Sequence, residues 1–263
     1  MRWDLFAILM LLPWAATYAG SLAALHIKPG TDRRQGTLLG FAAGIMIAAS
    51  VWSLVMPAFK ETGHTPGGAA VVTLGFLLGC AGMLLLDKIV PHQHNNDNPP
   101  EGRPSRLSRP MLLVLAVALH NIPEGIALGV VISAAIRNAG MSWISAFLFA
   151  LGLALQNFPE GMAVVLPLYQ SGTDRKRCHR FGLLASFAEP AAAMIGLASA
   201  SLLSMLGGVI LPLILSAAAG AMIFIVVEEL IPQSQFSVQG HSATYGFLTG
   251  FWIMALMGVL GAG

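Results

Sequence analysis

The sequence predicts an all-α integral membrane protein with eight transmembrane helices. Of its 263 residues, 56% are hydrophobic and 10% are charged, against roughly 25% charged in typical soluble domains. Several apolar runs reach the roughly 20 residues that a helix needs to cross a bilayer, and 29 glycines allow close helix packing. The formal net charge of +2 is too small to indicate a nucleic-acid partner. We therefore expect one transmembrane domain over residues 1–263, in contact with lipid.

Each expected span is an apolar run bounded by polar or turn-forming residues. The spans cover residues 5–25, 37–59, 69–90, 111–135, 141–168, 181–204, 207–231 and 243–260. The connection over residues 91–110 is the one long polar loop, and it is rich in proline and contains histidine. Such a segment cannot bury an apolar core, so we expect it to be mobile.

The basic residues predict the orientation of the bundle. Eleven of the 14 lysines and arginines lie in or beside the first, third and fifth connections. Basic residues favour the cytoplasm, so these connections, loop 91–110 included, should be cytoplasmic and both termini outside. A cleaved signal peptide over residues 6–19 is the alternative reading of the N-terminus, but it would leave Lys28, Arg33 and Arg34 outside.

One polar motif occurs twice within apolar spans. Residues 118–129 read ALHNIPEGIALG and residues 154–165 read ALQNFPEGMAVV, so that Glu160 follows Glu124 by 36 residues. His120 and Glu124 are four residues apart and share a helix face, as do Gln156 and Glu160. An ionisable group inside the bilayer costs roughly 2.5–3.5 kcal/mol or more. The repeat therefore indicates a cation site near the middle of the membrane, on two antiparallel helices.

The prolines and glycines of the motif have their own consequences. Pro123 and Pro159 have no backbone N–H, so each releases the carbonyl four residues earlier from its helical hydrogen bond. Gly125 and Gly161 should allow a neighbouring backbone to come close. Irregular backbone at membrane depth is tolerated where it lines a cavity.

Other acidic and histidine residues extend the candidate site. Glu189 in the sixth span is predicted to lie at the depth of the motif. Glu228 and Glu229, near the inner end of the seventh span, either form an exit station for the cation or reach to the interface. His92 and His94 in the long loop either bind metal weakly or are simply solvated.

The ligand types indicate the class of metal. Imidazole suits zinc and iron, and carboxylate and amide oxygens suit harder ions such as manganese. We therefore expect Zn²⁺ as a transported substrate and not as a cofactor, with Cd²⁺, Fe²⁺, Mn²⁺ and Co²⁺ as alternatives. Two other hypotheses remain: an intramembrane metalloenzyme with a catalytic metal at the same site, and a proton-coupled carrier of an organic solute.

The sequence resembles a known family at these residues. HNIPEG, QNFPEG and the glutamate of the sixth span are similar to the ZIP (Zrt/Irt-like) metal transporters, specifically the prokaryotic GufA-type branch. The runs FAAGIMIAASVW, DKIVPHQH and EELIP, at residues 41–52, 87–94 and 228–232, are similar to the same branch. The resemblance covers nearly the whole chain.

The resemblance implies a ZIP-type bundle that moves divalent metal, chiefly zinc, into the cytoplasm across a bacterial cytoplasmic (inner) membrane. It also implies a homodimer and alternating access, neither of which the sequence itself indicates. Carried over by residue, a primary metal position would comprise His120, Glu124, Gln156, Glu160 and Glu189. A second position would comprise Asn121 and Asn157 with the same three glutamates as bridges. Asn157 stands where some relatives carry aspartate, and Glu228 where some carry histidine.

Overall fold

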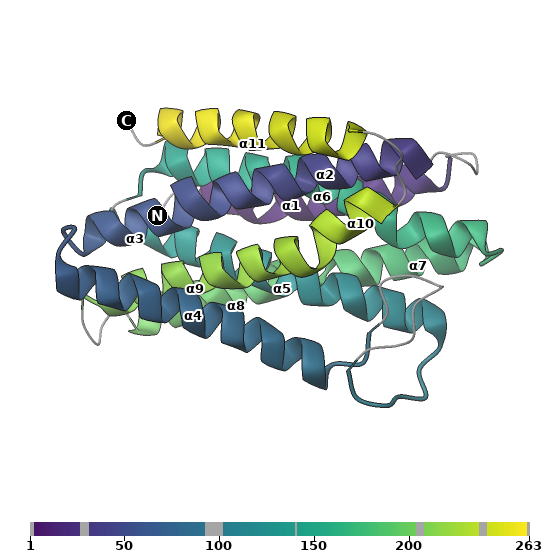
Figure 1. Ribbon diagram of the computed structural model, residues 1–263, viewed down its shortest axis with the longest axis horizontal. Coiled ribbons are helices and arrows are strands. Elements are labelled where there is room, and N and C mark those ends of the chain that lie inside the picture. The colour runs from purple at the N-terminus through teal and green to yellow at the C-terminus, as the bar shows by residue number, and fades with distance from the viewer. Residues whose placement is uncertain are drawn as a thin grey trace.

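The computed structural model describes residues 3–26, 32–92, 102–139, 141–203, 208–236 and 241–261. These residues form a bundle whose helices run side by side along the long axis of the molecule (Figure 1). Within the described ranges, 8 helical spans are long and apolar enough to cross a membrane. The all-α class and the number of spans expected from the sequence are therefore confirmed.

Five of the spans are single helices, and proline interrupts the other three. The uninterrupted helices are α1 (Trp3–Ala24), α4 (Pro66–Ile89), α5 (Arg109–Arg137), α6 (Trp143–Gln170) and α11 (Ser242–Gly261). The interrupted spans are α2 (Asp32–Ala49) with the π-helical η1 (Ser50–Val55) and α3 (Met56–Glu61), then α7 (Arg175–Ser186) with α8 (Ala188–Leu203), then α9 (Ile210–Ile225) with the π-helical η3 (Val226–Leu230) and α10 (Ile231–Phe236).

The interruptions follow from the position of proline. Pro57 and Pro232 each follow a π-helical segment, and Pro190 lies three residues after the break at Phe187. Proline cannot donate to the carbonyl four residues earlier, and the helix widens or breaks there. Pro123 and Pro159 lie inside α5 and α6, which both continue through them as helices. The apolar pattern alone does not distinguish these two outcomes.

The spans pack as four pairs, each with one inner and one outer helix. The inner helices α2, α5, α6 and α9 are the most buried, and they pair with α11, α8, α1 and α4 respectively. The outer helices expose large apolar side chains, such as Leu77, Leu85 and Trp252. A continuous apolar exterior of this kind suits a bilayer and not water.

Glycine brings the two backbones of each pair together. In the α1–α6 pair, a methyl group on Gly161 would overlap the carbonyl oxygen of Thr17, and one on Gly20 would overlap that of Phe158. The other three pairs have the same reciprocal arrangement. Gly125 of the first motif lies against the backbone of Glu189 in the same way. The close approach predicted for Gly125 and Gly161 is thus confirmed, and it holds each motif against an outer helix.

The connections sort to the two ends of the bundle. The first and fifth connections meet, since Arg175 Nη2 donates to His26 Nε2 over 2.9 Å. The N- and C-termini lie together at the opposite end (Figure 1). His94 and the larger part of the long loop, residues 93–101, lie outside the described residues.

Candidate functional site

The two motifs lie at the centre of the bundle, between two apolar clusters. The larger cluster includes Leu128 on α5 and Phe149 and Leu153 on α6, which lie toward the end that carries the termini. The smaller cluster includes Val114 on α5 and Val165 on α6, toward the other end. The polar side chains of the motifs therefore form a layer within an otherwise apolar interior.

The motifs contact each other directly. The side chain of Gln156 on α6 donates through Nε2 to Oε1 of Glu124 on α5, over 2.7 Å. Both residues are fully buried, with 0% exposure. The two antiparallel copies thus face each other, as the sequence predicted.

The asparagines connect the motifs to neighbouring helices. Asn157 Nδ2 donates to Oε2 of Glu189 on α8 over 2.6 Å and to the Pro13 carbonyl on α1 over 3.4 Å. Asn121 Nδ2 donates to the carbonyl of Ala185, near the end of α7, over 3.1 Å. Glu189 therefore lies beside the second motif, at the depth predicted for it.

The amide groups use their N–H donors on these partners, and this leaves acceptor atoms unpaired. Within this layer, seven buried side-chain oxygens of the described residues have no hydrogen-bond partner: Asn121 Oδ1, Glu124 Oε2, Gln156 Oε1, Asn157 Oδ1, both carboxylate oxygens of Glu160, and Glu189 Oε1. A buried polar atom without a partner costs about 1–3 kcal/mol. Seven such atoms in one layer, all acceptors, form an environment suited to a cation.

Glu160 accepts no hydrogen bond from a described residue, whereas Glu124 and Glu189 each accept one. It interacts electrostatically with His120, and Glu124 and Glu189 each interact with it. No described lysine or arginine forms an ion pair with these three carboxylates. Their negative charge is therefore not neutralised by the protein's own basic side chains.

The hydrogen-bond partner of His120 lies outside the two motifs. Its Nε2 donates to Oε2 of Glu229, a residue of the π-helical segment η3. Glu229 is buried, whereas the adjacent Glu228 is exposed. The two residues predicted as an exit pair thus face different surroundings, and only Glu229 contacts the motif layer.

The histidine and carboxylate groups are not gathered into a compact cluster. Among the described residues, no three His, Cys, Asp or Glu side chains come together as the ligands of one metal would. Gln156 is hydrogen-bonded to one carboxylate oxygen of Glu124, and Asn157 to one carboxylate oxygen of Glu189. His120 is hydrogen-bonded to Glu229. A metal bound here would have to draw these side chains from their present partners.

His92 is buried and does not lie in open solvent. Its Nδ1 donates to the Val90 carbonyl over 2.8 Å, and its Nε2 lies 3.1 Å from Oδ1 of Asp87 at the end of α4. Asp87 in turn interacts electrostatically with His120. Sequence reasoning did not connect Asp87 with the motif. The signal available for it was an acidic residue near the C-terminal end of an otherwise apolar span.

Comparisons with known proteins agree in naming one class. The family described as ZIP zinc transporter matches residues 90–258. Zinc transporter ZIPB of Bordetella bronchiseptica is 36% identical over 93% of this chain and 77% of its own length. Zinc transporter ZupT of Corynebacterium glutamicum is 36% identical over 96% of this chain and 97% of its own. Zinc transporter GufA of Myxococcus xanthus is 34% identical over 94% of each.

Proposed function

This chain belongs to the ZIP family of zinc transporters, and we propose that it moves divalent transition metal, chiefly Zn²⁺, across the membrane into the cytoplasm through the polar layer between α5, α6 and α8. The observation that carries the proposal is the set of seven buried oxygens without partners, which are all acceptors. A proton could satisfy one carboxylate oxygen, but it would leave the amide oxygens unpaired. A divalent cation satisfies both kinds of oxygen together.

We propose that the metal positions follow the two motifs. The primary position comprises His120, Glu124, Gln156, Glu160 and Glu189. The second comprises Asn121 and Asn157 with the three glutamates as bridges. Carboxylates and amides provide oxygen ligands for many divalent ions, while a neutral imidazole favours zinc and similar metals. The proposal assigns charge neutralisation to the glutamates and metal preference to His120, with Cd²⁺, Fe²⁺, Mn²⁺ and Co²⁺ as further substrates.

His120 has a second role in this proposal. Its hydrogen bond to Glu229 connects the motif layer to the inner end of the seventh span. A metal that recruits the imidazole must break this bond, and release of the metal allows it to form again. While the metal holds the imidazole, Glu229 has no bond to His120 and can receive the metal on its way inward. A binding site that exchanges partners in this way can select an ion and still release it.

The apolar cluster on the other side of the layer suggests how leakage is prevented. Leu128, Phe149 and Leu153 are fully buried between the motifs and the end that carries the termini. We propose that this end is outside, as the distribution of basic residues predicts, and that the cluster must separate before a metal can reach the motifs. The basic connections and Glu229 then lie toward the cytoplasm of a bacterial cell.

The first experiment measures Zn²⁺ uptake into proteoliposomes that contain a zinc-sensitive dye. It compares the wild-type chain with Glu124→Gln, and it uses Glu61→Gln as the matched control, because Glu61 is exposed at the last residue of α3. Glu124→Gln removes a carboxylate from the proposed metal site. Zn²⁺ uptake should therefore fall at least about tenfold, the equivalent of about 1.4 kcal/mol. The control should retain the wild-type rate.

Other outcomes would redirect the proposal. Equal uptake by wild type and Glu124→Gln would show that the metal does not pass through the motif layer. A wild-type protein that retains zinc without any flux, and that converts a lipid or peptide, would favour the intramembrane metalloenzyme, for which the matches with zinc transporters offer no support. Uptake of an organic solute that is indifferent to chelators would favour the proton-coupled carrier.

A further inference from the structure

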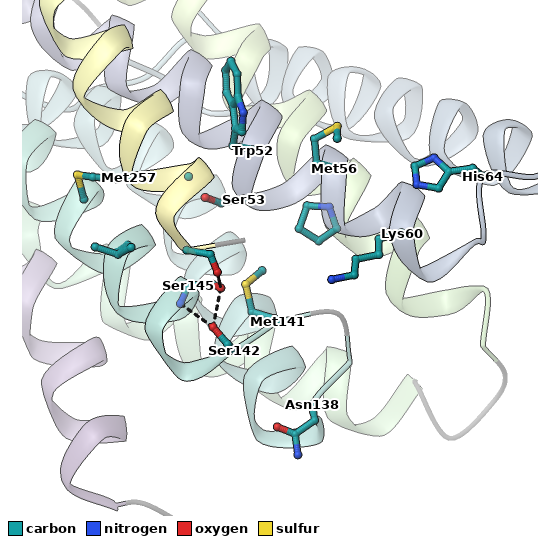
Figure 2. Close-up of a pocket in the computed structure, with 14 residues that line it drawn as sticks. Trp52, Ser53, Met56, Lys60, His64, Asn138, Met141, Ser142, Ser145 and Met257 are labelled. Atoms are coloured by element: carbon teal, nitrogen blue, oxygen red, sulfur yellow. Dashed lines mark hydrogen bonds between the residues drawn. The ribbon is translucent and has the colours of Figure 1, made fainter. Parts of the chain in front are cut away.

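A second polar feature lies far from the motif layer, at the end of the bundle that carries the termini. It is a pocket of about 450 Å³ between the end of α3, the start of α6 and the end of α11 (Figure 2). Lys60 and His64 are its only titratable lining residues among those described, and no Asp or Glu lines it. A divalent cation would find no carboxylate here, so the pocket is not a copy of the transport site.

Positive groups and donors converge on this pocket. Figure 2 shows the side chain of Lys60 extending toward Met141 and Ser142, and no described residue forms an ion pair with its ammonium group. Ser142 caps the first turn of α6, where its Oγ accepts from the N–H of Ser145 over 3.1 Å. The N-terminus of a helix carries a partial positive charge that favours an anion.

A buried hydroxyl and a strained residue add to this arrangement. Ser53 is only 7% exposed and lines the pocket, and its Oγ has no hydrogen-bond partner among the described residues. His64 adopts the left-handed conformation, with φ of 55°, and its ring stacks on Phe59 at 6.2 Å. A non-glycine residue in this conformation costs energy, and such residues gather at binding sites.

Large apolar side chains also line the pocket. Trp52, Leu148 and Met257 are among them. Tryptophan is typical of the membrane–water interface, where one part of a ligand is apolar and the other is hydrated. An anionic headgroup joined to an acyl chain matches this division, whereas a free inorganic anion would leave the apolar wall unused.

We propose that this pocket binds the phosphate of an anionic phospholipid from the adjacent leaflet. Lys60, Ser53 and the start of α6 would hold the phosphate, and the glycerol and first acyl carbons would lie against Trp52 and Met257. The bound headgroup would fasten together the end of α3, the start of α6 and the end of α11, which belong to two of the four helix pairs: α3 continues the span of α2, which pairs with α11, whereas α6 pairs with α1. This inference concerns lipid binding and stands independently of the proposed metal transport.

The test measures binding of dihexanoyl-phosphatidylglycerol to the full-length chain in an uncharged detergent, by calorimetric titration. Parallel titrations use dihexanoyl-phosphatidylcholine, sn-glycerol-3-phosphate and inorganic phosphate. Lys60→Gln should weaken phosphatidylglycerol binding about fivefold, the factor expected for one lysine at an anionic membrane surface. Ser53→Ala should weaken it in the same direction, and Lys60→Arg should retain it. Lys88→Gln, an exposed lysine at the opposite end of the bundle, is the matched control.

Saturable binding of phosphatidylglycerol that exceeds that of phosphatidylcholine, and that Lys60→Gln but not Lys88→Gln weakens, would support the proposal. Equal binding of the two lipids, equal loss in both lysine variants, or no saturable binding would overturn it. Binding of inorganic phosphate or glycerol phosphate as tight as that of the lipid would also overturn it, because the pocket would then hold a free anion.

Discussion

Replacing Glu160 by glutamine should stabilise the zinc-free protein and destabilise the zinc-bound protein. Both carboxylate oxygens of Glu160 are buried and have no hydrogen-bond partner within the described residues. The substitution therefore removes a negative charge without breaking a hydrogen bond. The new amide N–H groups would meet several unpaired acceptors in the same layer, which include Glu124 Oε2 and Asn157 Oδ1.

The size of each effect can be worked from these contacts. A charge in the bilayer costs about 2.5–3.5 kcal/mol, and this is the upper limit of the stabilisation expected for the zinc-free variant. For a protein of this length, 1 kcal/mol corresponds to about 2–4 °C in Tm. Zinc at 100 times its Kd stabilises the wild type by about 2.7 kcal/mol. The variant should lose most of this increment.

The assay is thermal unfolding in detergent, followed once with a chelator and once with saturating zinc. Relative to wild type, Glu160→Gln should have the higher Tm in chelator and the smaller increase with zinc. Glu61→Gln should match the wild type in both conditions, since Glu61 is exposed. A lower Tm for Glu160→Gln in chelator would refute the reasoning, because it would mean that the carboxylate is needed to hold the fold.

Three further predictions test the packing and the ligands. Gly161→Ala should destabilise the protein by about 1–3 kcal/mol, because the new methyl group overlaps the Thr17 carbonyl. The control Gly82→Ala, whose methyl group meets no atom within 4 Å, should be neutral or stabilising by up to about 1 kcal/mol. Equal effects of the two substitutions in thermal melts would contradict the helix pairing. His120→Ala should lower Zn²⁺ uptake about tenfold or more while Mn²⁺ uptake falls less, since manganese prefers oxygen ligands; an unchanged Zn²⁺/Mn²⁺ ratio in proteoliposomes would argue against the imidazole as the selective ligand. Asn157→Asp should lower the zinc-free Tm through an additional buried charge and raise the number of metal ions bound per chain, as measured by elemental analysis; a Tm equal to that of wild type in chelator would contradict this expectation.

The sequence by itself determined the class of the protein and the content of its central site. Apolar runs of a minimum length require helices in a bilayer. The repeated motif predicts that the two copies lie at the same depth on antiparallel spans, and the hydrogen bond from Gln156 to Glu124 joins them there. The depth of Glu189 also followed from its position in the sixth span, whereas its contact with Asn157 of the second motif is known only from the structure. Family resemblance extended this to a ligand set, which the experiments above are designed to test.

Only the tertiary structure decided which polar atoms have partners. The contact between His120 and Glu229 joins residues 109 positions apart, and it depends on a π-helical turn beside Pro232 that directs Glu229 inward and Glu228 outward. The bond from Asn121 to Ala185 likewise depends on where α7 ends near Pro190. Periodicity gives the face of a regular helix, but a proline shifts that face by an amount set by the neighbours it packs against. The pairing of each carboxylate is therefore a property of the packed bundle.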